Sequence, residues 1–321
     1  MTEPLRFDGR AVIVTGAGRG LGRAHALLLG SLGASVVVND LGSELSGTGA
    51  DSGPAHVVAE EIAAAGGEAV ASVADVADER SAGSIVELAL ARFGRIDVVV
   101  NNAGILTSDR FPEMGVDVLM RHLAVHVAGT FNVTRAAWPA MVQAGYGRVV
   151  ATTSSAVFGA PPLIGYAAAK GALIGLARSL AQLGAGDGIR VNLLAPAADT
   201  RMVLDPSLRA DNGLPPLPTD ASADPTRGPQ EVSPMLAVLA HESCPVNGEI
   251  ISAGGGRAAR VYLAETGGLV APGLEPAELL ARWPQIVDGE TTAIPQSTAE
   301  YIAHREARIA AASPDRHLTD G

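Results

Sequence analysis

The sequence predicts an α/β protein in which helices cover both faces of a parallel sheet. Short runs rich in valine and isoleucine alternate along the chain with longer, alanine-rich stretches of helical periodicity. The valine runs are continuous, which is typical of strands buried on both faces. The first run leads into a glycine-rich turn that starts at Gly16 and opens a helix. Together these observations predict a doubly wound, Rossmann-type parallel sheet.

The expected elements follow one another in regular order. We expect about seven strands, which lie at 11–15, 35–39, 68–73, 96–100, 148–152, 190–195 and 249–252. The helices between them are expected at 20–32, 55–65, 81–93, 116–141, 163–183 and 233–241. This alternation places successive strands in parallel, because each helix carries the chain back across the sheet.

The chain is expected to form one large domain over residues 1–266, followed by a C-terminal extension over residues 267–321 with one or two helices. Within the large domain, the region 203–230 is rich in proline and aspartate. It is too long for a simple connection in a compact domain, so we expect it to have a function of its own.

Composition excludes several classes of function. The 321 residues include 34 acidic and 23 basic side chains, a formal net charge of −11, which argues against binding to nucleic acid or to an anionic membrane. Cys244 is the single cysteine, so we expect neither an intramolecular disulfide nor a cysteine cluster that holds zinc, and we expect no metal. We expect neither a signal peptide nor a transmembrane segment, and a cytoplasmic location.

The glycine-rich turn predicts a binding site for the phosphates of a dinucleotide. Its expected contacts are Gly16, Arg19, Gly20, Leu21 and Gly22, where the backbone can approach a pyrophosphate at the start of a helix. Such a turn can also be purely structural. The end of the next expected strand favours the dinucleotide, because a carboxylate there, Asp40, can accept hydrogen bonds from the ribose hydroxyls.

Asp40 also bears on the choice between NAD and NADP. A carboxylate at this position would repel the 2′-phosphate of NADP, and Leu41 offers no cation to hold that phosphate. Arg19 is the opposing signal, since a cation in the glycine turn can meet the phosphate; a solvated loop cation is the other interpretation. We expect NAD.

Two further strand ends carry candidate cofactor contacts. Asp75 and Val76 follow the third strand, where they can bind the adenine, although Asp75 can equally cap the next helix. Asn102, Ala103 and Gly104 follow the fourth strand, and their small size lets the backbone pass close to a ligand. Ligands of open α/β sheets bind at these carboxyl ends.

A tyrosine and a lysine, Tyr166 and Lys170, predict acid–base chemistry. At a spacing of four residues their side chains share one face of a helix. A free tyrosine is a poor base at neutral pH, but a nearby ammonium lowers the pKa of the phenol. An incidental pair on an amphipathic helix is the alternative. Lys170 is the only lysine among 23 basic residues, which favours the functional interpretation.

These motifs resemble the short-chain dehydrogenase/reductase family. The matching residues occur in the family's order, as Thr15-Gly16-x-x-x-Gly20-x-Gly22, Asn101-Asn102-Ala103-Gly104, Tyr166-x-x-x-Lys170 and Pro196. Further stretches, including His241-Glu-Ser-Cys244, are similar to the (3R)-hydroxyacyl-CoA dehydrogenase domains of peroxisomal multifunctional enzymes of type 2. The resemblance covers nearly the whole chain.

The resemblance implies NAD-dependent oxidation of a secondary alcohol to a ketone, with a (3R)-hydroxyacyl-CoA as the expected substrate. A hydroxysteroid or another alcohol is the alternative substrate. The resemblance places substrate specificity near 203–230. It implies that Tyr166 accepts the hydroxyl proton and that Lys170 assists the tyrosine and binds the cofactor.

Several other roles come from the resemblance alone. A serine near the end of the fifth strand holds the substrate oxygen; counting along the chain favours Ser154, with Ser155 as the alternative. His126 stands where most of the family has asparagine, and a supporting catalytic role and a structural role are both open. Pro196 and Thr200 are expected to contact the cofactor.

The resemblance also implies a homodimer or homotetramer. Two other classes of function remain open at this point: a non-catalytic NAD-binding scaffold, and a lyase or epimerase on the same fold. The intact pair of Tyr166 and Lys170 argues against the scaffold, and tightly held NAD without net NADH formation would indicate the lyase or epimerase.

Overall fold

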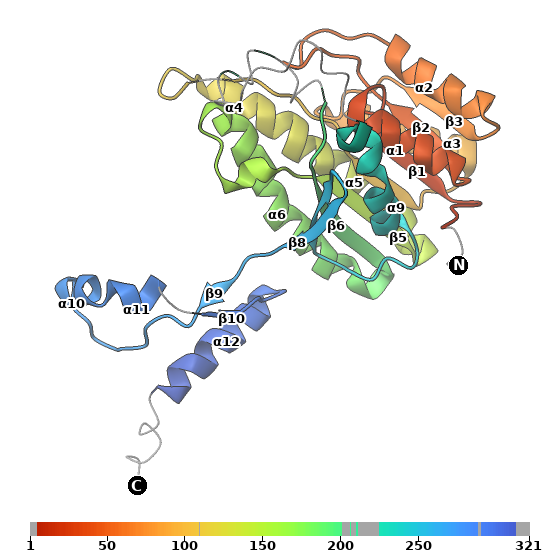
Figure 1. Ribbon diagram of the computed structural model, residues 1–321. Helices are drawn as coiled ribbons and strands as arrows, with labels where there is room; N and C mark the ends of the chain where they lie inside the picture. The colour runs from red at the N-terminus through yellow and green to blue at the C-terminus, as the bar shows by residue number, and fades with distance from the viewer. Residues whose placement is uncertain are drawn as a thin grey trace. The chain divides into compact units, whose positions relative to one another are not determined.

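The computed structural model describes residues 5–108, 110–200, 206, 210, 225–287 and 290–312. An eight-stranded sheet lies at its centre, in the order β3-β2-β1-β4-β5-β6-β7-β8 (Figure 1). Pairing is parallel from β3 across to β7, so the expected doubly wound sheet is confirmed. The strands are β1 (Ala11–Thr15), β2 (Ser35–Asn39), β3 (Glu68–Ser72), β4 (Val98–Asn101), β5 (Gly147–Thr152), β6 (Ile189–Pro196), β7 (Ile250–Gly254) and β8 (Arg257–Val261).

The eighth strand corrects the expected count of about seven. β8 lies beside β7 at the edge of the sheet, and its side chains are mostly exposed. Two of its five residues are arginines, Arg257 and Arg260, so it lacks the apolar run that marks the buried strands. Arg260 donates two hydrogen bonds of 2.7 Å to the carboxylate of Glu249, just before β7, which fixes the edge by charge pairing.

Alternate residues of each strand face opposite sides of the sheet, and both sides are covered. Val12 and Val14 of β1 belong to a core shared with α1 (Gly20–Ser31), α2 (Gly53–Ala64) and α9 (Ser233–Ala240). The opposite face packs against α3 (Glu79–Phe93), α5 (Gly129–Ala144) and α6 (Ile164–Gly184). Burial on both faces explains why the strands carry continuous valine runs.

The helical stretch expected at 116–141 is divided into three segments. α4 (Val116–His122) passes into a π-helical segment, η1 (Leu123–Ala128), which continues into α5. α5 runs past Pro139 and ends at Gly145, which has a φ of +60° and so terminates the helix in the left-handed conformation. Hydrophobic periodicity alone does not show the π-helical turn, which is rare outside functional sites.

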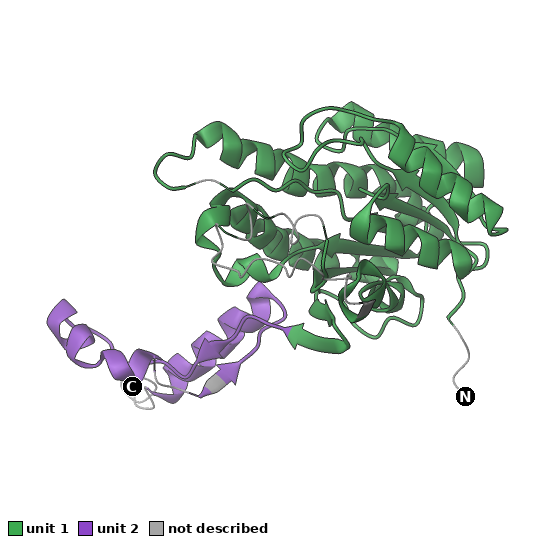
Figure 2. Cartoon of the chain, turned by 45° about the horizontal axis from the view of Figure 1, so that its top comes forward, with its two compact units in different colours: residues 1–260 green, residues 261–321 purple. Residues whose placement is uncertain are grey.

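Contacts along the chain divide it into two compact units, residues 1–260 and residues 261–321 (Figure 2). The second unit contains the antiparallel pair β9 (Glu265–Thr266) and β10 (Thr291–Ala293) and the helices α10 (Pro276–Ala281), α11 (Trp283–Val287) and α12 (Thr298–Ala311). None of its described side chains is fully buried. Most of the region 203–230 lies outside the described residues. In the described part of the chain, no helix is both long and apolar enough to span a membrane.

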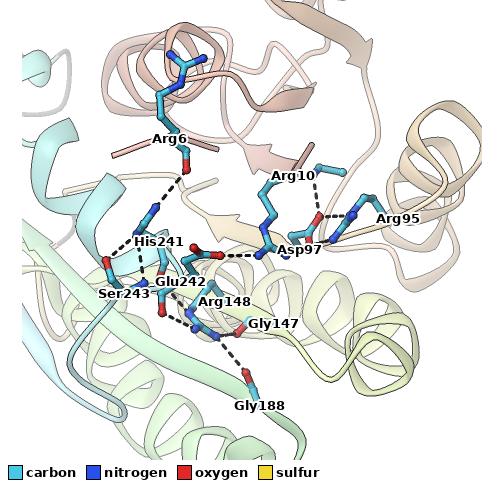
Figure 3. Close-up of polar contacts among 11 residues, drawn as sticks. Arg6, Arg10, Arg95, Asp97, Gly147, Arg148, Gly188, His241, Glu242 and Ser243 are labelled. Atoms are coloured by element: carbon cyan, nitrogen blue, oxygen red, sulfur yellow. Dashed lines mark hydrogen bonds and ion pairs between the residues drawn. The ribbon is translucent and has the colours of Figure 1, made fainter. Parts of the chain in front are cut away.

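A charged network joins the amino ends of the central strands (Figure 3). Asp97, just before β4, is 1% exposed, and its carboxylate accepts hydrogen bonds from Arg10, from Arg95 and from the backbone N–H of Ala11 at 2.7–2.9 Å. Arg10 also bonds Glu242 at 2.7 Å, beyond the end of α9. The network therefore ties β1, β4 and the segment after α9 together.

Arg148, the second residue of β5, satisfies four backbone carbonyls in the same region. Its guanidinium donates to the carbonyl oxygens of Gly147, Gly188, His241 and Glu242 at 2.7–3.1 Å (Figure 3). It also lies 4.4 Å from the ring centroid of Tyr146, and Arg10 contacts that ring at 4.0 Å. The amino edge of the sheet is thus held by hydrogen bonds and ion pairs around two buried charged groups, Asp97 and Arg148.

Candidate active site

A cavity of about 740 Å³ opens at the carboxyl ends of β1, β2, β4, β5 and β6. Every site residue expected from the sequence lines this cavity except Gly22, including both candidate serines, Ser154 and Ser155. The chain thus brings into one site residues that lie as far apart in sequence as Gly16 and Thr200. This location agrees with the rule that open α/β sheets bind ligands at their carboxyl edge.

The glycine turn is built to hold its backbone close to the next motif. Gly22 is buried within the turn, where any Cβ would overlap the carbonyl oxygen of Gly16. The hydroxyl of Thr15 accepts hydrogen bonds of 3.1 Å from the backbone N–H groups of Asn102 and Ala103. The side-chain amide of Asn102 donates back to the carbonyls of Thr15 and Gly16 at 3.1 Å. The two motifs therefore fix one another.

The geometry around the turn fits a dinucleotide. Gly20 starts α1 with a φ of +55°, and a Cβ there would meet no atom within 4 Å, so the helix N-terminus faces open space that can accept a pyrophosphate. The Asp40 carboxylate accepts hydrogen bonds of 2.7 Å from the N–H groups of Gly18 and Gly42. These bonds hold it on the cavity wall, where ribose hydroxyls would be within reach.

Arg19 has protein partners in the structure. Its guanidinium donates to the carbonyl of Ser43 at 3.5 Å and lies 4.0 Å from the carboxylate of Asp51. The sequence left open whether Arg19 is a phosphate ligand or a loop cation. These contacts hold the Arg19 guanidinium against the loop that follows β2.

Asp75 does not cap α3. The capping residue is Asp78, whose carboxylate accepts a 2.7 Å hydrogen bond from the N–H of Ser81. Asp75 instead accepts a hydrogen bond from the N–H of Ala77 at 2.8 Å and lines the cavity. Val76 beside it is 6% exposed, so this segment forms a fixed wall rather than the start of a helix.

Tyr166, in the first turn of α6, faces the cavity with Ser154. Burial raises the pKa of the Tyr166 phenol above its ordinary value, and a hydrogen bond with Ser154 lowers it in part. The Ser154 hydroxyl also accepts a 3.1 Å hydrogen bond from the N–H of Ala156. The sequence predicted a lowered tyrosine pKa; in the structure the pKa is raised, because desolvation exceeds the effect of the Ser154 hydrogen bond.

Lys170 is 3% exposed, and its ammonium donates a 2.6 Å hydrogen bond to the carbonyl of Thr152 at the end of β5. Its Nζ lies 5.5 Å from the ring centroid of Tyr166. Burial lowers the pKa of Lys170 from 10.5 to about 7. The group can therefore gain or lose a proton near neutral pH, which suits a site that moves protons.

His126 lies in the π-helical segment η1 and is 1% exposed. Its Nε2 is 2.9 Å from the carbonyl oxygen and 3.2 Å from the nitrogen of Ile105, and its ring centroid is 5.3 Å from that of Tyr166. Burial and the nearby Lys170 lower the pKa of His126 well below 6.5, so its imidazole is neutral at pH 7. Among the described residues its Nδ1 has no hydrogen-bond partner.

The structure adds lining residues that sequence reasoning missed. The loop after β2 contributes Glu44 and Leu45 to the cavity wall. Past β6, Asp199 and Arg227 form an ion pair at 3.2 Å on the wall, near the expected contacts Pro196 and Thr200. No motif signals these positions; only the proximity of the loops to the expected glycine turn and to Pro196 could have suggested them.

Comparison with known proteins decides the family. A sequence model of the short chain dehydrogenase family matches residues 10–208. The chain belongs to this family. As a short-chain dehydrogenase it is a member of an oxidoreductase family that uses a nicotinamide dinucleotide and acts on small molecules, and the family resemblance of its sequence is confirmed.

Two curated relatives illustrate the breadth of the match. The peroxisomal multifunctional enzyme type 2 of Mus musculus is 40% identical over 94% of this chain. A putative short-chain type dehydrogenase/reductase of Mycobacterium tuberculosis is 42% identical over 87% of this chain and 94% of its own length. The chain spans only 40% of the mouse enzyme, so the other activities of that longer protein do not transfer with the alignment.

Solved structures agree with these relatives. The full-length peroxisomal multifunctional enzyme type 2 of Drosophila melanogaster superposes with a TM-score of 0.75 and 29% identity over 97% of this chain and 51% of its own. A 7α-hydroxysteroid dehydrogenase in complex with NADH and 7-oxo glycochenodeoxycholic acid gives a TM-score of 0.68 and 29% identity, over 80% of this chain and 98% of its own.

Proposed function

We propose that this short-chain dehydrogenase oxidises a secondary alcohol to a ketone with NAD⁺, and that its substrate is a (3R)-hydroxyacyl-CoA, which becomes a 3-ketoacyl-CoA. The observation that carries the proposal is the placement of Tyr166, Ser154 and Lys170 in one cavity with the dinucleotide turn. The choice of substrate is supported by the match of nearly the whole chain to part of the multifunctional enzymes.

The preference for NAD over NADP rests on Asp40. Its carboxylate is held in place by two backbone N–H groups and lines the cavity, where it would repel a 2′-phosphate. Arg19, the nearest candidate for binding that phosphate, instead contacts Ser43 and Asp51. The NADH in the 7α-hydroxysteroid dehydrogenase complex is consistent with this choice.

The proposed chemistry divides the work among four side chains. When bound, the nicotinamide supplies the acceptor for the hydride that leaves the alcohol carbon. Ser154 holds the alcohol oxygen by a hydrogen bond, and the Tyr166 oxygen accepts its proton. Lys170 stabilises the phenolate form of Tyr166, which is the form that acts as a base. After the proton has moved to Tyr166, the Lys170 amine assists its transfer within the buried site. His126 supports the tyrosine as a neutral group.

The shifted pKa values fit this division of work. The phenol of Tyr166 is reluctant to ionise because it is buried, so a nearby positive charge has a large effect on it. Lys170 carries that charge at pH values below its pKa of about 7, and it is partly protonated near neutral pH. The phenolate form of Tyr166 therefore depends on the charged form of Lys170, which is present in part near neutral pH.

A hydroxysteroid or other secondary alcohol is the second candidate substrate. The specific observation in its favour is the structural match to a hydroxysteroid dehydrogenase bound to 7-oxo glycochenodeoxycholic acid. That match covers less of the chain than the match to the multifunctional enzyme and has a lower TM-score, so we rank it second.

One experiment separates the two candidates. Purified protein is assayed for NADH formation with (3R)- and (3S)-3-hydroxyacyl-CoA thioesters of short, medium and long chain, and with a panel of hydroxysteroids, each with NAD⁺ and with NADP⁺. Turnover of (3R) thioesters with NAD⁺ supports the proposal. Turnover of steroids alone establishes the second candidate, and turnover of neither overturns both.

We further propose that the protein is a cytoplasmic homodimer or homotetramer. Some of the curated relatives, including the mouse enzyme, are named for the peroxisome, so that location is a competing expectation for this chain. Light scattering of the purified protein measures the assembly, and fluorescence microscopy of a tagged chain in its own host measures the location.

A further inference from the structure

A second histidine, His122, lies beside the proposed catalytic tyrosine. It is the last residue of α4 and is 1% exposed. Its ring stacks on that of His126, with centroids 6.0 Å apart and planes within 6° of parallel. Both rings stand nearly perpendicular to the ring of Tyr166, at 81° and a centroid distance of 6.5 Å for His122, and at 84° and 5.3 Å for His126.

The backbone fixes the orientation of the His122 ring. Its Nδ1 lies 2.9 Å from the carbonyl oxygen of Val118, four residues earlier in the same helix. Because a carbonyl oxygen can only accept, we place a proton on Nδ1. The ring is thus anchored to α4 while its flat face is presented to His126.

Two glycines make room for this pair of rings. A Cβ at position 165, directly before the tyrosine, would lie 3.0 Å from Nδ1 of His122. A Cβ at position 104 would lie 2.5 Å from Cε1 of His126. Gly104 was expected to face the cofactor, but the structure shows that it also leaves space for an imidazole. Segments on either side of the rings are therefore shaped to accommodate them.

The backbone changes type at the same place. The π-helical segment η1 starts at the residue after His122 and contains His126. Single π-helical turns inside α-helices are found frequently at functional sites. The stacked rings, the two glycines and the π-helical turn form one arrangement around the tyrosine.

We propose that His122 is a positioning residue, which together with His126 forms a two-ring wall that fixes the orientation of the Tyr166 phenol and excludes water from that side of it. The inference rests on the proposed function, in which the Tyr166 oxygen accepts the proton of the alcohol. His122 does not touch the reacting atoms; it acts through the tyrosine.

The wall has an electrostatic consequence that can be measured. Among the described residues, the titratable groups that contact the Tyr166 ring are His122 from α4, His126 from η1 and Lys170 from its own helix. The charged pair of Arg121 and Asp117 on α4 lies on the exposed side of that helix. Burial raises the pKa of Tyr166, so water admitted in place of the His122 ring would lower it.

Two substitutions test the contribution of the His122 ring separately from that of its hydrogen bond to Val118. His122→Phe keeps a ring against Tyr166 and His126 but loses the bond to Val118. His122→Asn keeps a donor near the position of Nδ1 but removes the ring. His25→Asn is the matched control, because His25 is a fully buried histidine on α1 that bonds Ser233 outside the cavity.

With any secondary alcohol that the wild type oxidises, we expect His122→Asn to lower kcat at least about tenfold with KM within about twofold. The acid limb of its kcat–pH profile, which reports the ionisation of Tyr166 in the proposed mechanism, should move to lower pH by about half a unit or more. His122→Phe should keep kcat within about threefold and leave the limb in place. His25→Asn should lower the melting temperature without moving the limb.

The proposal would be overturned if both His122 variants lost kcat equally, if those losses followed only the melting temperatures, and if the acid limb did not move. That result would show a merely structural role for His122. A His122→Asn enzyme with the kcat and pH profile of the wild type would also overturn the proposal.

A measurement without turnover tests the wall itself. In protein with labelled tyrosine rings, with the Tyr166 signals assigned from Tyr166→Phe, we expect slow ring flipping in the wild type and fast flipping in His122→Asn. Fast flipping in the wild type would overturn the inference. This result is independent of the proposed function: a protein that oxidises no alcohol would refute the function and still report on the wall.

Discussion

At the amino ends of the strands, the buried carboxylate of Asp97 accepts hydrogen bonds from two arginines and a backbone N–H, and Arg148 donates to four carbonyls. At the carboxyl ends, the buried ammonium of Lys170 donates to one carbonyl, that of Thr152. In the described part of the chain, the hydroxyl of Thr152 and Nδ1 of His126 have no hydrogen-bond partner there.

The two edges of the sheet therefore use buried polar groups in different ways. Charges that have several partners from different segments hold those segments in one arrangement. Polar groups that are buried with few partners have shifted pKa values and unused hydrogen-bonding capacity, which a ligand or a moving proton can use. The amino edge therefore holds the sheet, and the carboxyl edge is available for chemistry.

The largest expected effect comes from removing the proposed base. Tyr166→Phe should lower kcat/KM about 10³-fold, because it removes the oxygen that is proposed to accept the proton of the alcohol. The dissociation constant for NADH, measured by fluorescence titration, should stay within about twofold. Tyr146→Phe is the control from the opposite edge and should keep wild-type kcat/KM. Activity that survives Tyr166→Phe would refute the proposed mechanism.

The next effect is on stability as a function of pH. Burial holds the pKa of Lys170 at about 7 in the folded chain, while the unfolded chain keeps that proton up to about pH 10. Between these values the unfolded state binds more protons, so stability rises with pH. Relative to Lys170→Met, the wild-type free energy of unfolding should rise by up to about 1.4 kcal/mol per pH unit.

Urea unfolding from pH 7 to pH 10 measures that slope. Lys170→Arg serves as the control, since a guanidinium stays protonated over the whole range and should be destabilising throughout. Parallel pH dependences for the wild type and Lys170→Met would show that Lys170 keeps an ordinary pKa.

At the amino edge, Asp97→Asn should lower the free energy of unfolding by about 3 kcal/mol, because it removes the charge that pairs with Arg10 and Arg95 in a buried setting. The kcat/KM of this variant should not change. Glu242→Gln is the matched control: the Glu242 side chain is 60% exposed, so its loss should cost less than about 1 kcal/mol. Reduced kcat/KM in a folded Asp97→Asn enzyme would show that the two edges are coupled.

The smallest effect concerns the choice of cofactor. Asp40→Asn should weaken NAD⁺ binding about tenfold and shift the ratio of kcat/KM toward NADP⁺, since the charge that repels a 2′-phosphate is gone. Steady-state kinetics with both cofactors measure the shift. Arg19→Ala should change the ratio by less than about threefold; a larger change would make Arg19 a phosphate ligand.

Much of this architecture was predictable from the sequence because it depends on local patterns. Buried parallel strands need continuous valine runs, so β1 and β2 were predicted at their observed bounds. The dinucleotide turn needs glycines at fixed spacing, and the four-residue spacing of Tyr166 and Lys170 places both on one helix face. These features constrain residue type at known intervals.

Other features depend on contacts that no interval encodes. β8 is an exposed edge strand held by Arg260 and Glu249, and nothing in its composition indicates a strand. The pairing of His122 with His126 requires a π-helical turn that hydrophobic periodicity does not reveal. The pKa of Tyr166 depends on burial by residues from several elements, so the sequence predicted the wrong direction.

The reach of Arg148 also has a consequence for the order of folding. Its acceptors at His241 and Glu242 lie 93 and 94 residues further along the chain. A growing chain that has not yet produced α9 leaves this guanidinium without those two carbonyls. Contacts of such long sequence separation form late, because the intervening loop must close first. The amino edge of the sheet is therefore completed only after the last third of the large unit has been synthesised.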